Sequence, residues 1–154
     1  MESTLAWKTD IEAALTDFSS VAKLATREDF TVPIEVEFLP APHRPSGLPA
    51  GKMAVYAFFG GGGWLKIGKV GPNSDARFRS QHYAPGRARS SLAGSLLMDD
   101  SFATENAIEA NSCGDWIKSN THRCNIYLPA SSEKSLLSLL EAFLHHRLKP
   151  RYEG

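Results

Sequence analysis

The stretch "VYAFFGGGGWLKIGK", residues 55–69, places four consecutive glycines between two short apolar runs. A phosphate-binding loop would need a helix and a Lys-Ser/Thr pair directly after the glycines. An apolar run follows them instead, so we interpret the glycines as the turn of a β-hairpin, where glycine supplies positive φ angles. We expect strands over 53–59 and 64–67.

The alternation of side chains in these strands also predicts their register. The pairing that buries the apolar residues best sets Val55 opposite Ile67 on one face. Tyr56 then lies opposite Lys66 on the other face, and residues 60–62 form the turn. We therefore expect the hairpin to hold the Tyr56 phenol beside the Lys66 ammonium.

The remaining pattern predicts an α+β fold with a small three-stranded antiparallel sheet flanked by helices. The third strand of this sheet is 123–128, and a further, half-exposed strand is expected over 33–39. Helices are expected over 9–25 with Thr9 as cap, 74–83 with Ser74 as cap, 90–100, and 131–148 after a Ser cap.

A proline-rich segment suggests the domain organisation. Residues 40–51 contain four prolines, so they can hold neither a helix nor a central strand. We interpret them as a linker, with residues 1–51 forming an N-terminal helix-strand extension and residues 52–154 forming the core domain. The apolar stripe of the N-terminal helix needs a partner, so we expect the extension to dock on the core.

Composition restricts the class of protein. The chain has 154 residues, of which 42% are apolar and 22% charged, as in ordinary globular proteins. It has neither an apolar run of membrane-spanning length nor a secretory signal pattern, so we expect a cytoplasmic protein without a membrane partner. Cys113 and Cys124 are expected to be reduced thiols.

The net charge is zero, but it is unevenly spread along the chain. Residues 52–90 carry seven Lys/Arg against one Asp, whereas residues 1–51 carry four against eight Asp/Glu. The basic block indicates a polyanion partner, with a solvated basic face as the alternative. The acidic N-terminal segment complements this block, and it also offers a contact for a protein partner or a second copy of the chain.

Five short segments together resemble the GIY-YIG nuclease family. They are "AVY" (54–56), "KIG" (66–68), the arginine of "DARFRSQHY", the glutamate of "LLEAFLHHRL", and the closing "PRYEG". The resemblance covers about residues 52–154 and rests on the order and spacing of the motifs. The chain departs from the family's pattern in "AVY", at Lys66 where tyrosine is usual, and at Glu153 where asparagine is usual.

The resemblance implies a metal-dependent endonuclease that hydrolyses DNA. Tyr56 would orient or deprotonate the attacking water, and Lys66 would lower the pKa of Tyr56 and contact phosphate. Arg77 would clamp the scissile phosphate. His82 would bond to the phosphate or the leaving group, or else serve in capping or packing. Glu141 would bind one Mg²⁺ or Mn²⁺.

Glu141 also has an argument of its own. It lies near the apolar stripe of a leucine-rich helix, where a carboxylate is costly unless a partner neutralises it. A divalent cation would do so, and the alternative is a salt bridge, with Arg123 or His145 as the expected partner. Zinc is not expected, because Cys113, His122 and Cys124 match no paired-ligand spacing.

Other arginines are expected to contact the nucleic acid. Arg79 replaces Arg77 as the clamp if the helix has another phase, and the substrate-binding candidates are Arg79, Arg87, Arg89 and Arg123. Two other functions stay open. One is a nucleic-acid-binding module that has kept the fold and lost catalysis, and the other is a protein-interaction module that acts through the acidic N-terminal segment.

Overall fold

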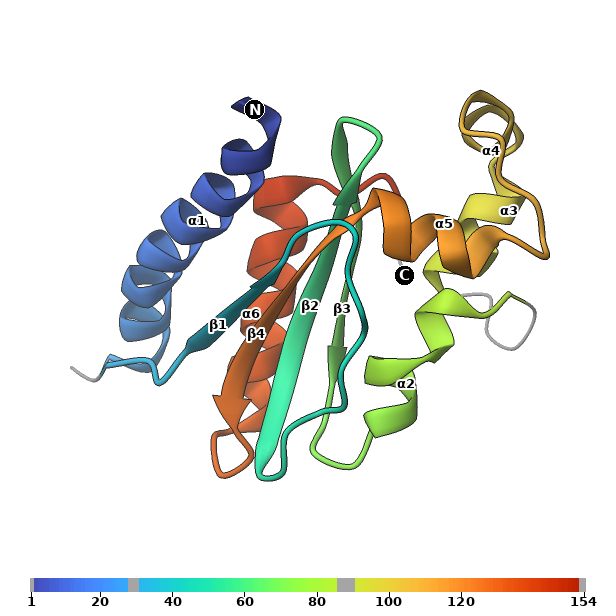
Figure 1. Cartoon of the computed structure of the whole chain (residues 1–154). Coiled ribbons are helices and arrows are strands. Elements are labelled where there is room, and N and C mark those ends of the chain that lie inside the picture. Colours follow the sequence, from blue (N-terminus) through green and yellow to red (C-terminus); the bar gives the residue numbers. More distant parts are fainter. Residues whose placement is uncertain (1, 28–30, 86–90, 153–154) are drawn as a thin grey trace.

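The computed structural model describes residues 2–27, 31–85 and 91–152, and it places them around one antiparallel sheet. The strands are β1 (Glu35–Leu39), β2 (Lys52–Gly60), β3 (Gly63–Val70) and β4 (His122–Pro129), in the order β1-β4-β2-β3 (Figure 1). The α+β class with flanking helices is confirmed. The three-strand prediction is wrong, because β1 pairs along its whole length with β4.

Helices cover both faces of this sheet. On one face, α1 (Glu2–Thr26) and α6 (Lys134–Leu148) enclose an apolar core with the inward side chains of β2 and β4. The other face packs against α2 (Asp75–Arg79), the short 3-10 helix η1 (Gln81–Tyr83), α3 (Leu92–Met98), α4 (Asp100–Glu105) and α5 (Cys113–Asn120) (Figure 1). Within the described ranges, no helix is both long and apolar enough to cross a membrane.

The N-terminal helix begins seven residues earlier than predicted. Thr9 is not its cap but an interior residue whose hydroxyl donates to the Leu5 carbonyl. The helix extends backwards because Trp7 is fully buried and stacks on His122, with ring centroids 4.8 Å apart. The extension therefore docks on the core, as predicted.

The hairpin register differs from the prediction by two residues. Tyr56 lies opposite Gly68, and Lys66 lies opposite Phe58. Lys66 and Tyr56 still share a face, because the shift is even, but they are diagonal neighbours instead of direct partners. A register shift between Phe58 and Phe59 then brings Gly60 opposite Gly63.

The turn explains the difference. It contains only two residues, Gly61 and Gly62, with φ angles of +61° and +86°. Two consecutive positive φ angles are the requirement of a type I′ hairpin turn, which suits the right-handed twist of the strands. Four glycines in a row allow several such turns, so the sequence did not specify which pair would be used.

Helix ends account for the other differences. The predicted helix 74–83 is divided into α2 and η1, and the side chain of Ser74 makes no cap hydrogen bond. Helix α6 begins at Lys134, with Glu133 and not a serine in the cap position. The segment 101–116 contains α4 except for its first residue, Asp100, and the beginning of α5.

Candidate active site

Tyr56 lies at the centre of the candidate site, on the face of β2 that packs against α2 and η1. Its side chain is fully buried and lies over Gly68 of β3. A Cβ atom at position 68 would come within 2.6 Å of the Tyr56 Oη and 2.8 Å of its Cζ. The phenol therefore occupies the space that a side chain would fill if position 68, the glycine of "KIG", were any other residue.

His82 of η1 holds the phenol from the other side. Its Nε2 is 2.5 Å from the Tyr56 Oη, and its Nδ1 is 3.0 Å from the backbone nitrogen of Leu92. Because the Leu92 N–H can only donate, Nδ1 carries no proton. The neutral ring is then protonated on Nε2, and this N–H donates to the Tyr56 oxygen.

The electrostatics of the site keep this ring neutral. Burial, together with the charges of Arg77, Arg123 and Lys66, lowers the pKa of His82 from 6.5 to about 3. The imidazole is thus neutral at pH 7. It does not act as a base toward Tyr56, but it is a fixed donor that stabilises the phenolate. The prediction that His82 bonds to phosphate or the leaving group does not fit this placement.

The charges that counteract the effect of burial on the Tyr56 pKa come from arginines and not from Lys66. Burial raises the pKa of Tyr56, whereas Arg77, by its charge and a hydrogen bond, and Arg123, by its charge, lower it. The prediction that Lys66 lowers the pKa of Tyr56 assumed that the two residues lie directly opposite each other, which is wrong. The structure does bring Arg77 and Tyr56 together, as expected from the position of Arg77 at the start of the helix after β3.

Lys66 is an ammonium group enclosed by protein. Its side chain is 1% exposed, and its Nζ has no hydrogen-bond partner among the residues that the structure describes. Burial and the charge of Arg77 lower the pKa of Lys66. A buried ammonium without a partner is costly, and the lowered pKa of Lys66 reflects this cost.

Glu141 reaches the edge of the sheet from α6. Its carboxylate is 3.6 Å from the Lys69 Nζ, and its charge raises the pKa of Tyr56. The two predicted partners are wrong, since Arg123 is bonded elsewhere and His145 donates to the Ile67 carbonyl. Beside Glu141 lies an open cavity of about 520 Å³, which is also lined by Ala142, His145, His146, Lys149 and Pro150.

A magnesium ion would suit this carboxylate. Mg²⁺ keeps most of its waters and takes only one or two protein carboxylates, with substrate phosphate as a further ligand. Glu141 is half-buried and already next to a cation, and its charge reaches Tyr56. The described residues contain no group of three or more His, Cys, Asp or Glu side chains that would form a closed metal site.

Arg123 is not a surface residue. It is 0% exposed, and its three hydrogen bonds go to the Asn125 Oδ1 (2.8 Å), the Tyr83 Oη (3.0 Å) and the Phe78 carbonyl (2.8 Å). Its predicted contact with substrate does not fit this position. Of the other substrate-binding candidates, Arg79 is exposed and pairs with Asp75, while Arg87 and Arg89 lie outside the described residues.

Sequence reasoning missed His43, which comes from the segment interpreted as a linker. Its Nδ1–H donates to the Thr121 carbonyl (2.8 Å), and its Nε2 accepts the hydroxyl proton of Tyr83 (2.7 Å). His43 is 5% exposed, and its pKa falls from 6.5 to about 4, chiefly through burial. No periodicity marks a single histidine among prolines, so this contact had no signal in the sequence.

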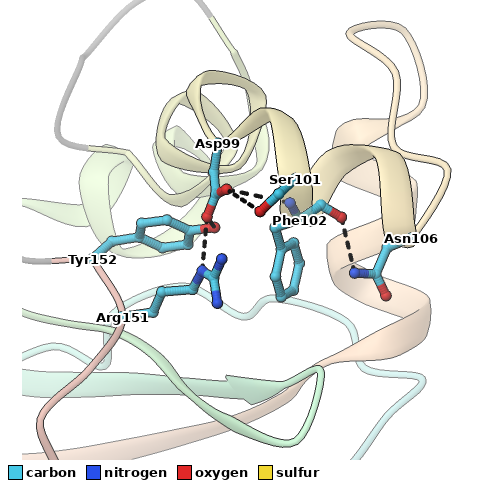
Figure 2. Close-up of polar contacts among 6 residues, drawn as sticks. All are labelled: Asp99, Ser101, Phe102, Asn106, Arg151 and Tyr152. Carbon is cyan, nitrogen blue, oxygen red and sulfur yellow. Dashed lines mark hydrogen bonds and ion pairs between the residues drawn. The ribbon is translucent and has the colours of Figure 1, made fainter.

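The closing segment fastens the helices to the hairpin. The Asp99 carboxylate accepts hydrogen bonds from the Arg151 Nε (2.7 Å) and the Tyr152 hydroxyl (2.8 Å) (Figure 2). The backbone nitrogens of Arg151 and Tyr152 donate to the carbonyls of Trp64 and Leu65, so this segment runs beside Lys66. Glu153, which replaces the family's usual asparagine, lies outside the described residues.

Comparison with known proteins adds no assignment. No protein-family model, curated protein or solved structure matches the chain.

Proposed function

We propose that this chain is a metal-dependent endonuclease that hydrolyses phosphodiester bonds in DNA, as its resemblance to GIY-YIG nucleases implies. The observation that carries the proposal is the unpartnered Lys66 ammonium beside the Tyr56–His82 pair. The Arg77 charge acts on all three side chains. A phosphate diester would supply an anion for the Lys66 ammonium.

Tyr56 and His82 are the groups that act on the attacking water. Because His82 donates to the Tyr56 oxygen, the phenolic hydrogen of Tyr56 is free to point toward a ligand. Tyr56 orients the water while it is protonated and accepts its proton when it is ionised. A phosphodiester bound near the phenol brings negative charge, which disfavours the phenolate. Lys66 and Arg77 must neutralise this charge so that Tyr56 can still ionise.

Lys66 and Arg77 bind the scissile phosphate. The planar guanidinium of Arg77 suits two phosphate oxygens, and the Lys66 ammonium acts as a point charge. Lys66 comes from β3 and Arg77 from α2. Both elements pack on Tyr56 of β2, β3 through Gly68 and α2 through the buried Phe78. The exposed Arg79, and from the sequence alone Arg87 and Arg89, would contact neighbouring phosphates.

Glu141 would hold the divalent cation, Mg²⁺ or Mn²⁺, which supplies charge neutralisation on the phosphate and a more acidic bound water. Lys69 occupies the vicinity of this carboxylate, 3.6 Å away. Its ammonium therefore balances the Glu141 charge in the metal-free protein and must give up this contact on metal binding.

An inactive nucleic-acid-binding module of the same fold is the second candidate. The observation that favours it is the enclosure of the site, since Tyr56, Lys66 and His82 are each at most 1% exposed. A protein-interaction module has weaker support, because the apolar stripe of α1 is already buried by the chain's own core. A protein partner or second copy bound through α1 and a cytoplasmic location stay predictions.

Incubation with labelled single- and double-stranded DNA separates the two candidates. We expect cleavage with Mg²⁺, none with EDTA, and a loss of most cleavage in the Tyr56→Phe variant. DNA retarded in a gel but never cleaved, in Mg²⁺ or in Mn²⁺, would support the inactive module and reject the nuclease.

A further inference from the structure

Arg123 of β4 is a permanent charge inside the protein. It is 0% exposed, and the groups that accept its hydrogen bonds, from Asn125, Tyr83 and Phe78, are all neutral. An arginine does not lose its proton in proteins, so this charge is present at every pH at which the protein folds. Keeping it there is costly, and packing alone would be served by an apolar side chain.

Aromatic rings surround the guanidinium. Its central carbon lies over the rings of Phe78, Tyr56 and Phe58, at 4.5, 5.1 and 5.1 Å from their centroids. A cation over the face of a phenol is attracted more strongly when the phenol becomes a phenolate, because the ring then carries negative charge. Of these three rings, only that of Tyr56 ionises. The ring of Tyr83, which also ionises, has its centroid 6.0 Å from the same carbon, and its hydroxyl accepts from Arg123.

A polar chain connects Arg123 to the edge of the sheet. The Asn125 Oδ1 accepts from Arg123, and its Nδ2 donates to the Glu37 Oε1 of β1 (2.9 Å), which also accepts from the Tyr127 hydroxyl (2.8 Å). A carboxylate only accepts, so Glu37 fixes the orientation of the Asn125 amide that Arg123 requires. Asn125 and Glu37 are direct cross-strand partners.

We propose that Arg123 is a positioning residue of the nuclease site, a buried cation that holds the Tyr56 ring and stabilises its phenolate, and that Glu37 anchors it through Asn125. The inference rests on the proposed function in assigning the Tyr56 phenolate a catalytic use. It makes β1, which lies outside the family-like segment, part of the catalytic support.

The other charged and titratable side chains that act on this site are not substituted in the test. They are His82 from η1, Arg77 from α2, Lys66 from β3 and Glu141 from α6. The charge of Arg123 lowers the pKa of Tyr56, in agreement with its position over the ring. Removal of the charge should therefore disfavour the phenolate, while a change of shape alone should not.

The test is a titration in metal-free buffer without DNA. A fluorinated tyrosine, whose phenol is more acidic than that of tyrosine, is incorporated at position 56 and followed by ¹⁹F NMR. We expect Arg123→Met to decrease the acid dissociation constant about tenfold, and Arg123→Lys, which keeps the charge, to leave it within about twofold. Arg123→Gln, which keeps a hydrogen-bond donor, replaces Arg123→Met if that variant does not fold.

An unchanged titration in a folded neutral variant overturns the proposal. Because no cleavage is measured, failure of the nuclease assignment would not affect this result. The anchor is tested by solvent exchange of the Arg123 Nε–H. Glu37→Gln should accelerate it, since a glutamine amide does not fix the Asn125 orientation, whereas the exposed Glu35→Gln should not. Equal exchange rates in both variants reject the anchor.

Discussion

Gly68 decides where the Tyr56 phenol lies, because any side chain at this position would overlap it. We expect Gly68→Ala to displace the ring from His82, to lower the cleavage rate at least about 100-fold, and to destabilise the fold by about 1–3 kcal/mol. Gly71→Ala is the matched control, since a Cβ there has no described heavy atom within 4 Å. Single-turnover cleavage and thermal unfolding measure both effects. Wild-type cleavage by Gly68→Ala would show that the position of the phenol is not critical.

Tyr56→Phe removes one oxygen and keeps the ring. The variant should lose most cleavage, as the proposed mechanism requires. It should also lose about 1–3 kcal/mol of unfolding free energy, because the buried Nε2–H of His82 would have no acceptor. Urea unfolding and the same cleavage assay check this prediction. Full activity would remove the tyrosine from the mechanism.

The sequence predicted these residues better than their contacts. His82 and Arg77 bond to the Tyr56 phenol, and Lys66 lies on the same face of the hairpin, whereas Glu141 acts on Tyr56 only through its charge. Their pairing was wrong because it depends on which two glycines take positive φ, a choice that four identical letters do not carry. The burial of Arg123 also could not be predicted from the sequence, since arginine is mostly a surface residue.

At the scale of elements, the closing segment is held by one carboxylate. Asp99→Asn keeps the shape but removes the charge that bonds Arg151 and Tyr152 (Figure 2). We expect faster hydrogen exchange of the Arg151 and Tyr152 amides, which donate to the hairpin strand β3. Asp100→Asn, on the next residue, is the control. Unchanged protection of both amides in Asp99→Asn would mean that the backbone contacts alone hold the segment.

Element types were more predictable than element partners. The alternation in 33–39 predicted a strand, and the leucine spacing in 131–148 predicted a helix, because both patterns are local. The pairing of β1 with β4 joins residues about ninety positions apart, and no local pattern encodes it. The early start of α1 likewise depends on the pocket that His122 and Phe38 form for Trp7.

For the whole molecule, two buried histidines predict a loss of stability in mild acid. The pKa values of His43 and His82 are about 4 and 3 in the folded protein, against 6.5 when unfolded. Below pH 6.5 the unfolded chain binds these protons first, so stability is complete above this pH and falls as the pH decreases toward the folded values. At about 1.4 kcal/mol per pH unit, each histidine should cost about 2 kcal/mol by pH 5.

Urea unfolding at pH 7 and pH 5 measures this loss. His43→Gln should reduce the difference between the unfolding free energies at the two pH values by about the contribution of one histidine. His146→Gln, which replaces an exposed histidine, should leave it unchanged. A wild-type stability that is equal at both pH values would contradict the burial of neutral imidazoles.

The N-terminal extension belongs to the folded unit that carries the site, because it supplies a strand, a helix and His43 to it. The apolar stripe of the N-terminal helix predicted the docking of the extension. It did not predict that the proline-rich segment would be fixed, since His43 is held by Thr121 and Tyr83 and its backbone bonds to Lys118.

Metal-dependent DNA cleavage shows whether the protein is a nuclease whose metal is held by Glu141. The rate of the wild-type protein is measured under single-turnover conditions over a series of Mg²⁺ concentrations, beside Glu141→Gln and the exposed control Glu133→Gln. We expect saturating, EDTA-sensitive cleavage by the wild type and the control, and a loss of at least about 1,000-fold in folded Glu141→Gln that keeps its DNA binding. Cleavage by Glu141→Gln at the wild-type rate, or a wild-type protein that cleaves no DNA with any divalent cation, would contradict the account.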